Sequence, residues 1–188
     1  SEFLADPALM LRLGEGGLAS HGTAAGLLLW FTVVARRHRV PLLDAFDRGS
    51  FSGFFGAGLV RLGNFFNSEI VGRPTDQTWG VRFPHFDGVD APLRHPIQLY
   101  EMVWLWLVVS VLLLVDRRHG DARPPGLLVS LAFALYFTGR LLLEPFKAPL
   151  VLSAESIVSM GQLLSVLPAL LGWYGVWWTT RRADSASP

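Results

Sequence analysis

The 188-residue sequence contains no cysteine, and charged residues make up only 16% of it. The missing thiols exclude a disulfide, a cysteine nucleophile and a cysteine-ligated metal within these residues. The charged fraction lies well below the roughly 25% that is usual in soluble domains, whereas apolar residues reach 51%. The formal net charge of +1 provides no global basic field that would attract nucleic acid. The sequence is therefore that of one unusually apolar domain.

Common catalytic and metal-binding signatures are missing as well. The five histidines are scattered, and no HExxH spacing or carboxylate pair at ligand spacing is present. The sequence therefore predicts no metal site and no cofactor. No G-x-S-x-G element appears, which argues against a serine lipase, and no phosphate-binding P-loop is present.

Long apolar blocks dominate what is present. Blocks of this length are typical of helices that span a membrane, and a very apolar soluble core is the alternative. The second block is the weakest because it is rich in glycine, but small residues let membrane helices approach closely. The predicted fold class is all-α, a single polytopic membrane helical bundle of about five transmembrane helices. These are expected at 17–35, 46–62, 96–115, 127–143 and 161–178.

Between the second and third blocks, residues 63–95 carry many Pro, Asp and Gly residues and are expected to form a loop region. A short strand is expected within it, at 79–83. Arginine pairs end the first, third and fifth blocks, and such clusters mark the cytoplasmic side of a membrane. The loop region is therefore expected to be extracytoplasmic. The same orientation brings His21, Arg61 and Arg140 to the outer side.

Arg140 and Glu144 are four residues apart and thus share one helical face, with Tyr136 one turn earlier. Ionisable groups at membrane depth are costly and usually face a cavity. One interpretation is an anion site in which Glu144 orients Arg140 and Tyr136 contributes to substrate binding. The alternative is a single ion pair that fixes helix packing.

A second group of polar residues begins at Arg61. Asn64 lies one helical turn later, and Asn67, Glu69 and Gly72 follow. Two guanidinium groups at one level of the membrane hold a phosphate more rigidly than lysines do. The asparagines are candidates for binding glyceryl and phosphate oxygens or, alternatively, for capping or cross-linking helices. Arg61 alternatively extends towards lipid head groups.

His21 is expected at the outer mouth of the first helix, between small residues that leave room for a ligand. A neutral imidazole there accepts a proton from a thiol with a pKa of about 8.5. A packed or hydrogen-bonded histidine is the alternative. His95, Gln98, Tyr100 and Glu101 begin the third helix and are interpreted as mainly structural.

The stretch from Arg61 to Arg73, RLGNFFNSEIVGR, resembles the signature of prolipoprotein diacylglyceryl transferases. Four further segments resemble that family in the same order along the chain. They are residues 16–22, 94–101, 136–147 and 159–162.

The resemblance implies a multi-pass enzyme of the bacterial cytoplasmic (inner) membrane whose active site faces the extracytoplasmic side. Such an enzyme transfers the diacylglyceryl group of phosphatidylglycerol, a membrane lipid. The acceptor is the thiol of the lipobox cysteine in a prolipoprotein signal peptide. The products are a thioether and glycerol phosphate, in the first step of bacterial lipoprotein maturation.

The resemblance also implies roles for particular residues. Arg61 and Arg140 hold the lipid phosphate, and His21 is the candidate base. The residues that shape the substrate site are Asn64, Glu69, Gly72 and Glu144.

The sequence departs from the family pattern at several positions. Thr23 replaces a glycine near His21, and Pro145 directly follows Glu144. Lys147 stands where an arginine is common, so this position is expected to bind a phosphate as a point charge only. We further expect the N-terminal helices of the family, with a site tyrosine, to be missing from these 188 residues. Two alternatives to a transferase remain open at this point, namely a non-catalytic lipid-binding or transport protein and a purely structural membrane partner.

Overall fold

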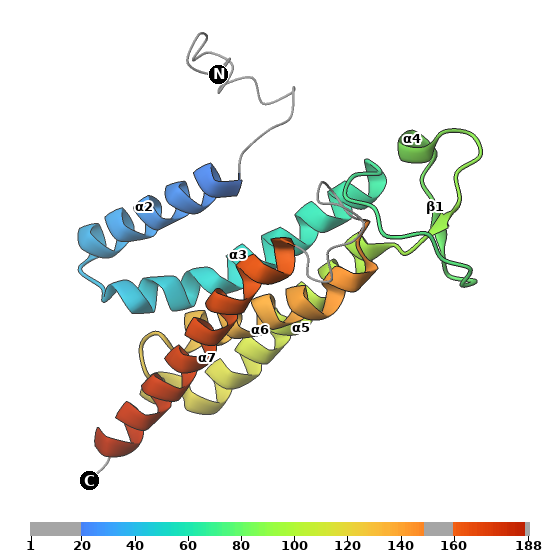
Figure 1. Cartoon of the computed structure of the whole chain (residues 1–188). Coiled ribbons are helices and arrows are strands. Elements are labelled where there is room, and N and C mark those ends of the chain that lie inside the picture. Colours follow the sequence, from blue (N-terminus) through green and yellow to red (C-terminus); the bar gives the residue numbers. More distant parts are fainter. Residues whose placement is uncertain (1–19, 149–159, 187–188) are drawn as a thin grey trace. The chain divides into compact units, whose positions relative to one another are not determined.

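The computed structural model describes residues 20–148 and 160–186 (Figure 1). Within them, five long helices overlap the five expected blocks, so the predicted all-helical class is confirmed. The second is longer than predicted at both ends. The long helices are α2 (Ser20–His38), α3 (Leu42–Phe66), α5 (Ile97–His119), α6 (Leu127–Leu143) and α7 (Met160–Ala186).

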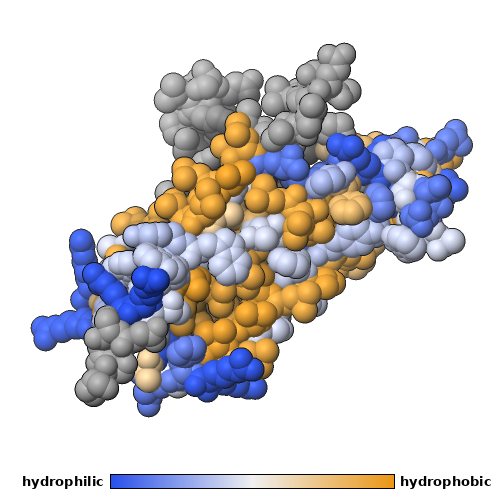
Figure 2. Space-filling model, turned by 60° about the horizontal axis from the view of Figure 1, so that its bottom comes forward, coloured by the Kyte–Doolittle hydropathy of each residue, from blue (hydrophilic) through white to orange (hydrophobic). Residues whose placement is uncertain are grey.

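Two segments of the described chain are long and apolar enough to cross a membrane, at Ile97–Ala122 and Leu127–Phe146. Only 33% and 28% of their most apolar windows are buried, whereas the core helix of a soluble protein would be mostly buried. Hydrophobic side chains cover the middle of the face in Figure 2, and hydrophilic side chains gather towards its ends. The count of five membrane-spanning helices remains a prediction.

The chain divides into two compact units, Ser1–Ala45 and Phe46–Pro188. In the first unit, α2 ends at a left-handed residue, Arg39, with a φ of 54°. The amide of Val40 then donates to the carbonyl of Ala35 at 3.0 Å. This geometry satisfies a carbonyl at the helix end.

The second unit is built around α5, α6 and α7, which run side by side in Figure 1. Val108 and Leu112 of α5 pack with Leu128 and Ala132 of α6, and Phe51 and Phe54 of α3 cover them. A Cβ at Gly172 of α7 would overlap the backbone nitrogen of Ala134 in α6. Small residues therefore let these helices approach closely, as is usual for helices packed in lipid.

Asp47 joins α3 to the beginning of α6. Its fully buried carboxylate accepts hydrogen bonds from the backbone amides of Gly126 and Val129, both at 2.8 Å. The first amides of a helix have no partner within the helix and carry partial positive charge, so a carboxylate there is stabilising. Arg123 lies 3.6 Å from Asp47 and also pairs with Asp116 of α5.

The loop region spans residues 67–96 at the other end of these helices. It contains the antiparallel strands β1 (Val81–Arg82) and β2 (Leu93–Arg94) with the short helix α4 (Pro84–Asp87) between them. The short strand expected at 79–83 is thus present as β1. The predicted start of the loop at residue 63 is wrong, because α3 continues to Phe66.

Two short 3₁₀ helices complete the described chain. They are η2 (Gly120–Ala122) after α5 and η3 (Glu144–Phe146) after α6. An isolated bridge pairs Gly72 of the loop region with Lys147, just after η3.

Candidate functional site

A small, narrow cleft lies where the ends of α3, α5 and α6 meet. It brings together three residues singled out in the sequence, Arg61, Tyr136 and Arg140. The cleft is lined by Arg61, Glu101, Trp104, Leu105, Tyr136, Arg140 and Leu143.

Trp104 forms one wall of the cleft, and a glycine on α6 makes room for it. The indole nitrogen donates to the carbonyl of Leu135 at 3.0 Å. A Cβ at Gly139 would overlap the same indole ring. The absence of a side chain at Gly139 therefore lets the Trp104 ring pack closely against α6. Gly139 directly precedes Arg140 in that helix.

Arg61 lies near the end of α3 and contacts Glu101 of α5. Its Nε is 3.0 Å from Oε2 of Glu101, and Lys147 Nζ is 2.6 Å from Oε1 of the same carboxylate. The Arg61 contact is too oblique to be a well-aligned hydrogen bond, so it is a close charge contact. Glu101 was interpreted from the sequence as mainly structural, but it lines the cleft.

Asn64 connects Arg61 to Glu69. With its amide oriented to satisfy both neighbours, Asn64 donates to Glu69 Oε2 at 3.1 Å and accepts from Arg61 Nη1 at 3.3 Å. Both contacts are possible because α3 continues through Arg61 and Asn64. The three residues form one connected polar group at the helix end.

A strained turn holds Glu69 in this position. The flanking residues Ser68 and Ile70 have φ values of 56° and 52°, which are unfavourable for residues with a side chain, above all a β-branched one. The turn is fixed by two hydrogen bonds, from Glu69 N to Asn64 O at 2.9 Å and from Gln98 Nε2 to Glu69 O at 2.7 Å. Such strain persists only where surrounding contacts enforce it.

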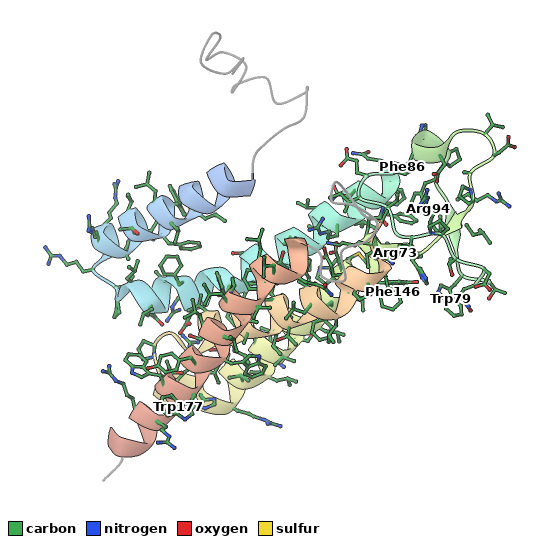
Figure 3. The ribbon with its side chains drawn as sticks, viewed as in Figure 1. Arg73, Trp79, Phe86, Arg94, Phe146 and Trp177 are labelled. Carbon is green, nitrogen blue, oxygen red and sulfur yellow. The ribbon has the colours of Figure 1, made fainter. Side chains whose placement is uncertain are left out.

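Gly72 lies where three segments meet. A Cβ at this position would overlap the carbonyl oxygen of His95 and lie 2.9 Å from that of Phe146. The next residue, Arg73, donates its backbone amide to Phe146 O at 2.8 Å and its Nε to Lys147 O at 2.9 Å. Figure 3 shows Arg73 and Phe146 together at the base of the loop region. Glycine is therefore required here by space.

The alternative of an ion pair between Arg140 and Glu144 that fixes helix packing is not supported, because no ion pair or hydrogen bond joins the two among the described residues. Glu144 Oε2 instead lies 3.8 Å from Lys147 Nζ. Pro145 ends the helical path and the chain continues as η3, which brings Lys147 towards Glu144. A Cβ at Gly161 of α7 would overlap Glu144 Oε1, so the carboxylate packs against that helix.

Arg140 lines the cleft from the last turn of α6, and no ion pair or hydrogen bond joins its guanidinium to another residue of the described chain. Tyr136 is one turn earlier, and its ring packs edge-on against Phe54 of α3, with 5.6 Å between centroids. The helical spacing therefore places both residues at the cleft, as predicted.

Of the other two predicted site residues, Asn67 does not line the cleft and His21 has no described side chain. Asn67 is exposed just beyond α3, and its side chain makes no hydrogen bond within residues 20–148 and 160–186. His21 falls in α2, which belongs to the first unit, and its side chain lies outside the described residues. Its role as a base stays a prediction.

Sequence reasoning assigned no role to Trp104 and interpreted Gln98 and Glu101 as mainly structural. One signal was available, because an acidic residue inside an otherwise apolar helix is costly unless a partner or cavity stabilises it. Glu101 fits that description. The contacts of Gln98 with Glu69 and of Lys147 with Glu101 join distant segments and carry no local signal.

An ion pair in the loop region holds the segment around Gly72 in place. Arg94 binds Asp87 through two contacts, Nε–Oδ2 at 2.7 Å and Nη2–Oδ1 at 2.6 Å, and its Nη1 donates to Gly72 O at 3.0 Å. The hydrogen bonds from Arg94 lower the pKa of Asp87 below its ordinary value. Phe86 packs against the guanidinium, 5.3 Å away (Figure 3). Arg94 thus ties α4 to the Gly72 segment.

The apolar helices and the arginine-lined cleft define a helical membrane protein with a cationic site. The family model of prolipoprotein diacylglyceryl transferase matches residues 2–178. The chain therefore belongs to the prolipoprotein diacylglyceryl transferase family, a family of bacterial membrane enzymes.

Three relatives, each named phosphatidylglycerol–prolipoprotein diacylglyceryl transferase, illustrate the similarity. The chain is 40% identical over 172 residues to the one from Tolumonas auensis, covering 90% of this chain and 65% of the relative. It is 36% identical over 184 residues to that from Chloroherpeton thalassium, covering 97% and 68%. The Geobacter sulfurreducens protein is 40% identical over 176 residues, with 92% and 65% covered. The chain thus spans about two thirds of the length of the relatives it matches.

Proposed function

We propose that this chain takes part in transferring the diacylglyceryl group of phosphatidylglycerol to the lipobox cysteine of a prolipoprotein. The observation that carries the proposal is the cleft lined by Arg61 of α3 and Arg140 of α6. Family membership supports the same reaction, since the relatives' names specify this donor and this acceptor. Those names do not favour a non-catalytic lipid-binding or transport protein.

In this proposal the two guanidinium groups bind the phosphodiester of the lipid. Arg140 makes no ion pair with the described residues, so its charge is available to an anion that enters the cleft. Arg61 is held by Glu101 of α5 and by Asn64, one turn later on its own helix α3, and presents its remaining donors. Guanidinium forks match phosphate oxygens in geometry as well as charge.

The reaction forms one bond and breaks one. The thiolate sulfur attacks the glyceryl carbon that bears the phosphate ester, the carbon–sulfur bond forms, and the carbon–oxygen bond breaks. The bonding pair leaves with the phosphate oxygen as glycerol phosphate. Because negative charge develops on that oxygen, two cations beside it stabilise the transition state more than the ground state.

The nucleophile must come from the acceptor, because the sequence contains no cysteine. A thiol is a weak nucleophile until it loses its proton. His21 is the proposed acceptor of that proton, on the sequence reasoning given above. Asn64, Glu69, Gly72 and Tyr136 shape the donor site in this proposal, with Glu144 beside Lys147 at its edge.

The proposed setting is the bacterial cytoplasmic membrane, with five spanning helices and the cleft on the extracytoplasmic side. Arginine pairs near the ends of α2, α5 and α7 support this orientation by the positive-inside rule. The lipobox cysteine reaches the extracytoplasmic side when the signal peptide crosses the membrane. Lipid enters from the bilayer.

A reconstitution assay tests the function. The membrane-embedded protein is incubated with phosphatidylglycerol vesicles and a lipobox peptide, and mass spectrometry measures the gain of a diacylglyceryl group on cysteine. Arg140→Ala should lower the gain about 10²- to 10³-fold, and a peptide with Ser in place of the cysteine should remain unmodified. Lipid binding without any thioether in the wild-type protein would contradict the transferase and support a lipid-binding protein.

A further inference from the structure

Glu101 is the point where two cations from distant segments meet. It belongs to α5, and its side chain is only 10% exposed. One carboxylate oxygen contacts Arg61 of α3 and the other contacts Lys147, which follows η3. Placing a carboxylate in a buried apolar position is costly, and partner charges offset that cost only when their geometry is good. Glu101 therefore fixes where Arg61 and Lys147 lie relative to each other.

Lys147 is itself fixed by the loop region. Its backbone carbonyl accepts a hydrogen bond from Arg73 Nε at 2.9 Å, and it forms an antiparallel bridge with Gly72. The next residue, Ala148, donates to Val71 O at 3.2 Å. Residues 71–73 thus hold the backbone that carries the Lys147 ammonium group.

Helix α5 reaches the end of α3 at a second point. Gln98, fully buried and three residues before Glu101, holds the carbonyl of Glu69. Glu69 contacts Asn64, which contacts Arg61. The guanidinium of Arg61 is consequently located from two directions, through its own Nε by Glu101 and through Nη1 by Asn64.

We propose that Glu101 and Lys147 are positioning residues that link the backbone of the loop region to the Arg61 guanidinium. This inference rests on the proposed function, in which Arg61 binds the lipid phosphate. Glu101 competes with that phosphate for Arg61, and Lys147 draws part of the carboxylate's charge away from it. The affinity of Arg61 for an anionic lipid is therefore set by how Glu101 divides its charge between two cations.

Two single substitutions should change lipid affinity in opposite directions. Glu101→Gln removes the competing charge, so the Kd for phosphatidylglycerol falls. The rate constant of thioether formation falls about 10- to 100-fold, as expected when a charged contact that orients a group is lost. Lys147→Met leaves the whole Glu101 charge on Arg61, so the Kd for phosphatidylglycerol rises, and Lys147→Arg restores it.

The double variant separates this account from a direct contact between Lys147 and lipid. If Lys147 acts through Glu101, then Lys147→Met has no further effect on the Kd once Glu101→Gln is present. If Lys147 touches the phosphate itself, the same weakening persists in the double variant, and the proposal is overturned. Asp90→Asn is the matched control, because Asp90 is an exposed carboxylate of the loop region and makes no described contact. It should leave both the Kd and the rate unchanged.

The measurements use the membrane-embedded protein and fluorescent phosphatidylglycerol, with the thioether rate determined on the same samples. A wild-type protein that binds the lipid but forms no thioether would refute the transferase, whereas the Kd values would still decide the positioning roles. Unchanged Kd values in both single variants would overturn the inference even if the transferase is active. Where Glu101→Gln fails to fold, as judged by its thermal melt, a wild-type Kd in Lys147→Met overturns the inference. A raised Kd that Lys147→Arg restores supports it.

Discussion

Helices α3, α5 and α6 each contribute charged or polar groups to two clusters, one at either end of the second unit. At one end Asp47, Asp116 and Arg123 surround the beginning of α6, and every described carboxylate contact there is with a cation or a backbone amide. At the other end Arg61, Glu101 and Arg140 surround a cleft. The first cluster is closed by its own partners, whereas Arg140 in the second has no partner among the described residues.

The contrast shows how the same residue types serve different purposes. Buried charges that satisfy one another fix the packing of helices and offer nothing to a ligand. A partly buried cation that faces a cleft, as Arg140 does, retains its attraction for an anion, and its cost must be offset by the rest of the fold. Substitutions at the two ends should therefore separate stability from activity.

The largest effect is expected from Arg140→Ala, which removes the cation that faces the cleft. Thioether formation should fall about 10²- to 10³-fold, the range for removing one group that stabilises developing negative charge. Thermal stability should change little, because no described partner is lost. A steady-state assay beside a thermal melt measures both quantities. A large loss of thermal stability beside the loss of rate would mean that Arg140 mainly fixes helix packing.

Asp47→Ala should have the opposite profile. The substitution removes the acceptor for the amides of Gly126 and Val129 and leaves the Arg123 guanidinium without a buried counter-charge. The free energy of unfolding should fall by about 3 kcal/mol, as when one partner of a buried pair is deleted.

Unfolding in detergent measures the change in Asp47→Ala, and activity is expressed per folded molecule. That specific activity should remain at the wild-type level. A specific activity that falls together with stability would show that the two ends are coupled and would break the comparison.

Gly72→Ala should affect both stability and activity, because Gly72 connects the loop region to the residues around the cleft. An added methyl group overlaps the carbonyl of His95, and overpacking of this kind costs about 1–3 kcal/mol. The shift also displaces Lys147, which is paired with Gly72. Thermal melts and thioether rates test the expectation, with Gly88→Ala as a control of similar chemistry in open space. The control carries the strain of a positive φ at Gly88, so only its activity is expected to remain normal.

Local periodicity accounts for what the sequence predicted correctly. Arg61 with Asn64, and Tyr136 with Arg140, lie three or four residues apart on helices, and that spacing alone places each pair on one face. The positions of the apolar blocks likewise predicted where helices form. These inferences need only the geometry of a single helix.

The remaining features depend on contacts between segments far apart in the chain. Asp47 accepts hydrogen bonds at the beginning of α6 although it is 79 residues away from Gly126 in the sequence. No local pattern around Asp47 indicates that it caps another helix. Glu144 was assigned to Arg140 because the two are four residues apart. Pro145 and η3 instead turn the chain so that Lys147 becomes its neighbour. The rule that residues four apart share a helical face failed here because α6 ends at Leu143, one residue before Glu144.

The smallest effect is expected in the loop region, where acidic pH should weaken the ion pair between Asp87 and Arg94. Arg94 lowers the pKa of Asp87 in the folded protein below the ordinary value of 3.8. The unfolded state therefore binds the proton more readily, so this pair stabilises the fold above that pH, and the contribution is lost as the pH falls through the lowered pKa. Hydrogen exchange of residues 84–95, measured between pH 5 and 2.5, should show protection that declines towards acid. In Asp87→Asn the protection should be lower near pH 5, and the difference from wild type should shrink as the pH falls. A difference that stays constant over this range would mean that the Asp87 charge does not hold the loop region to Gly72.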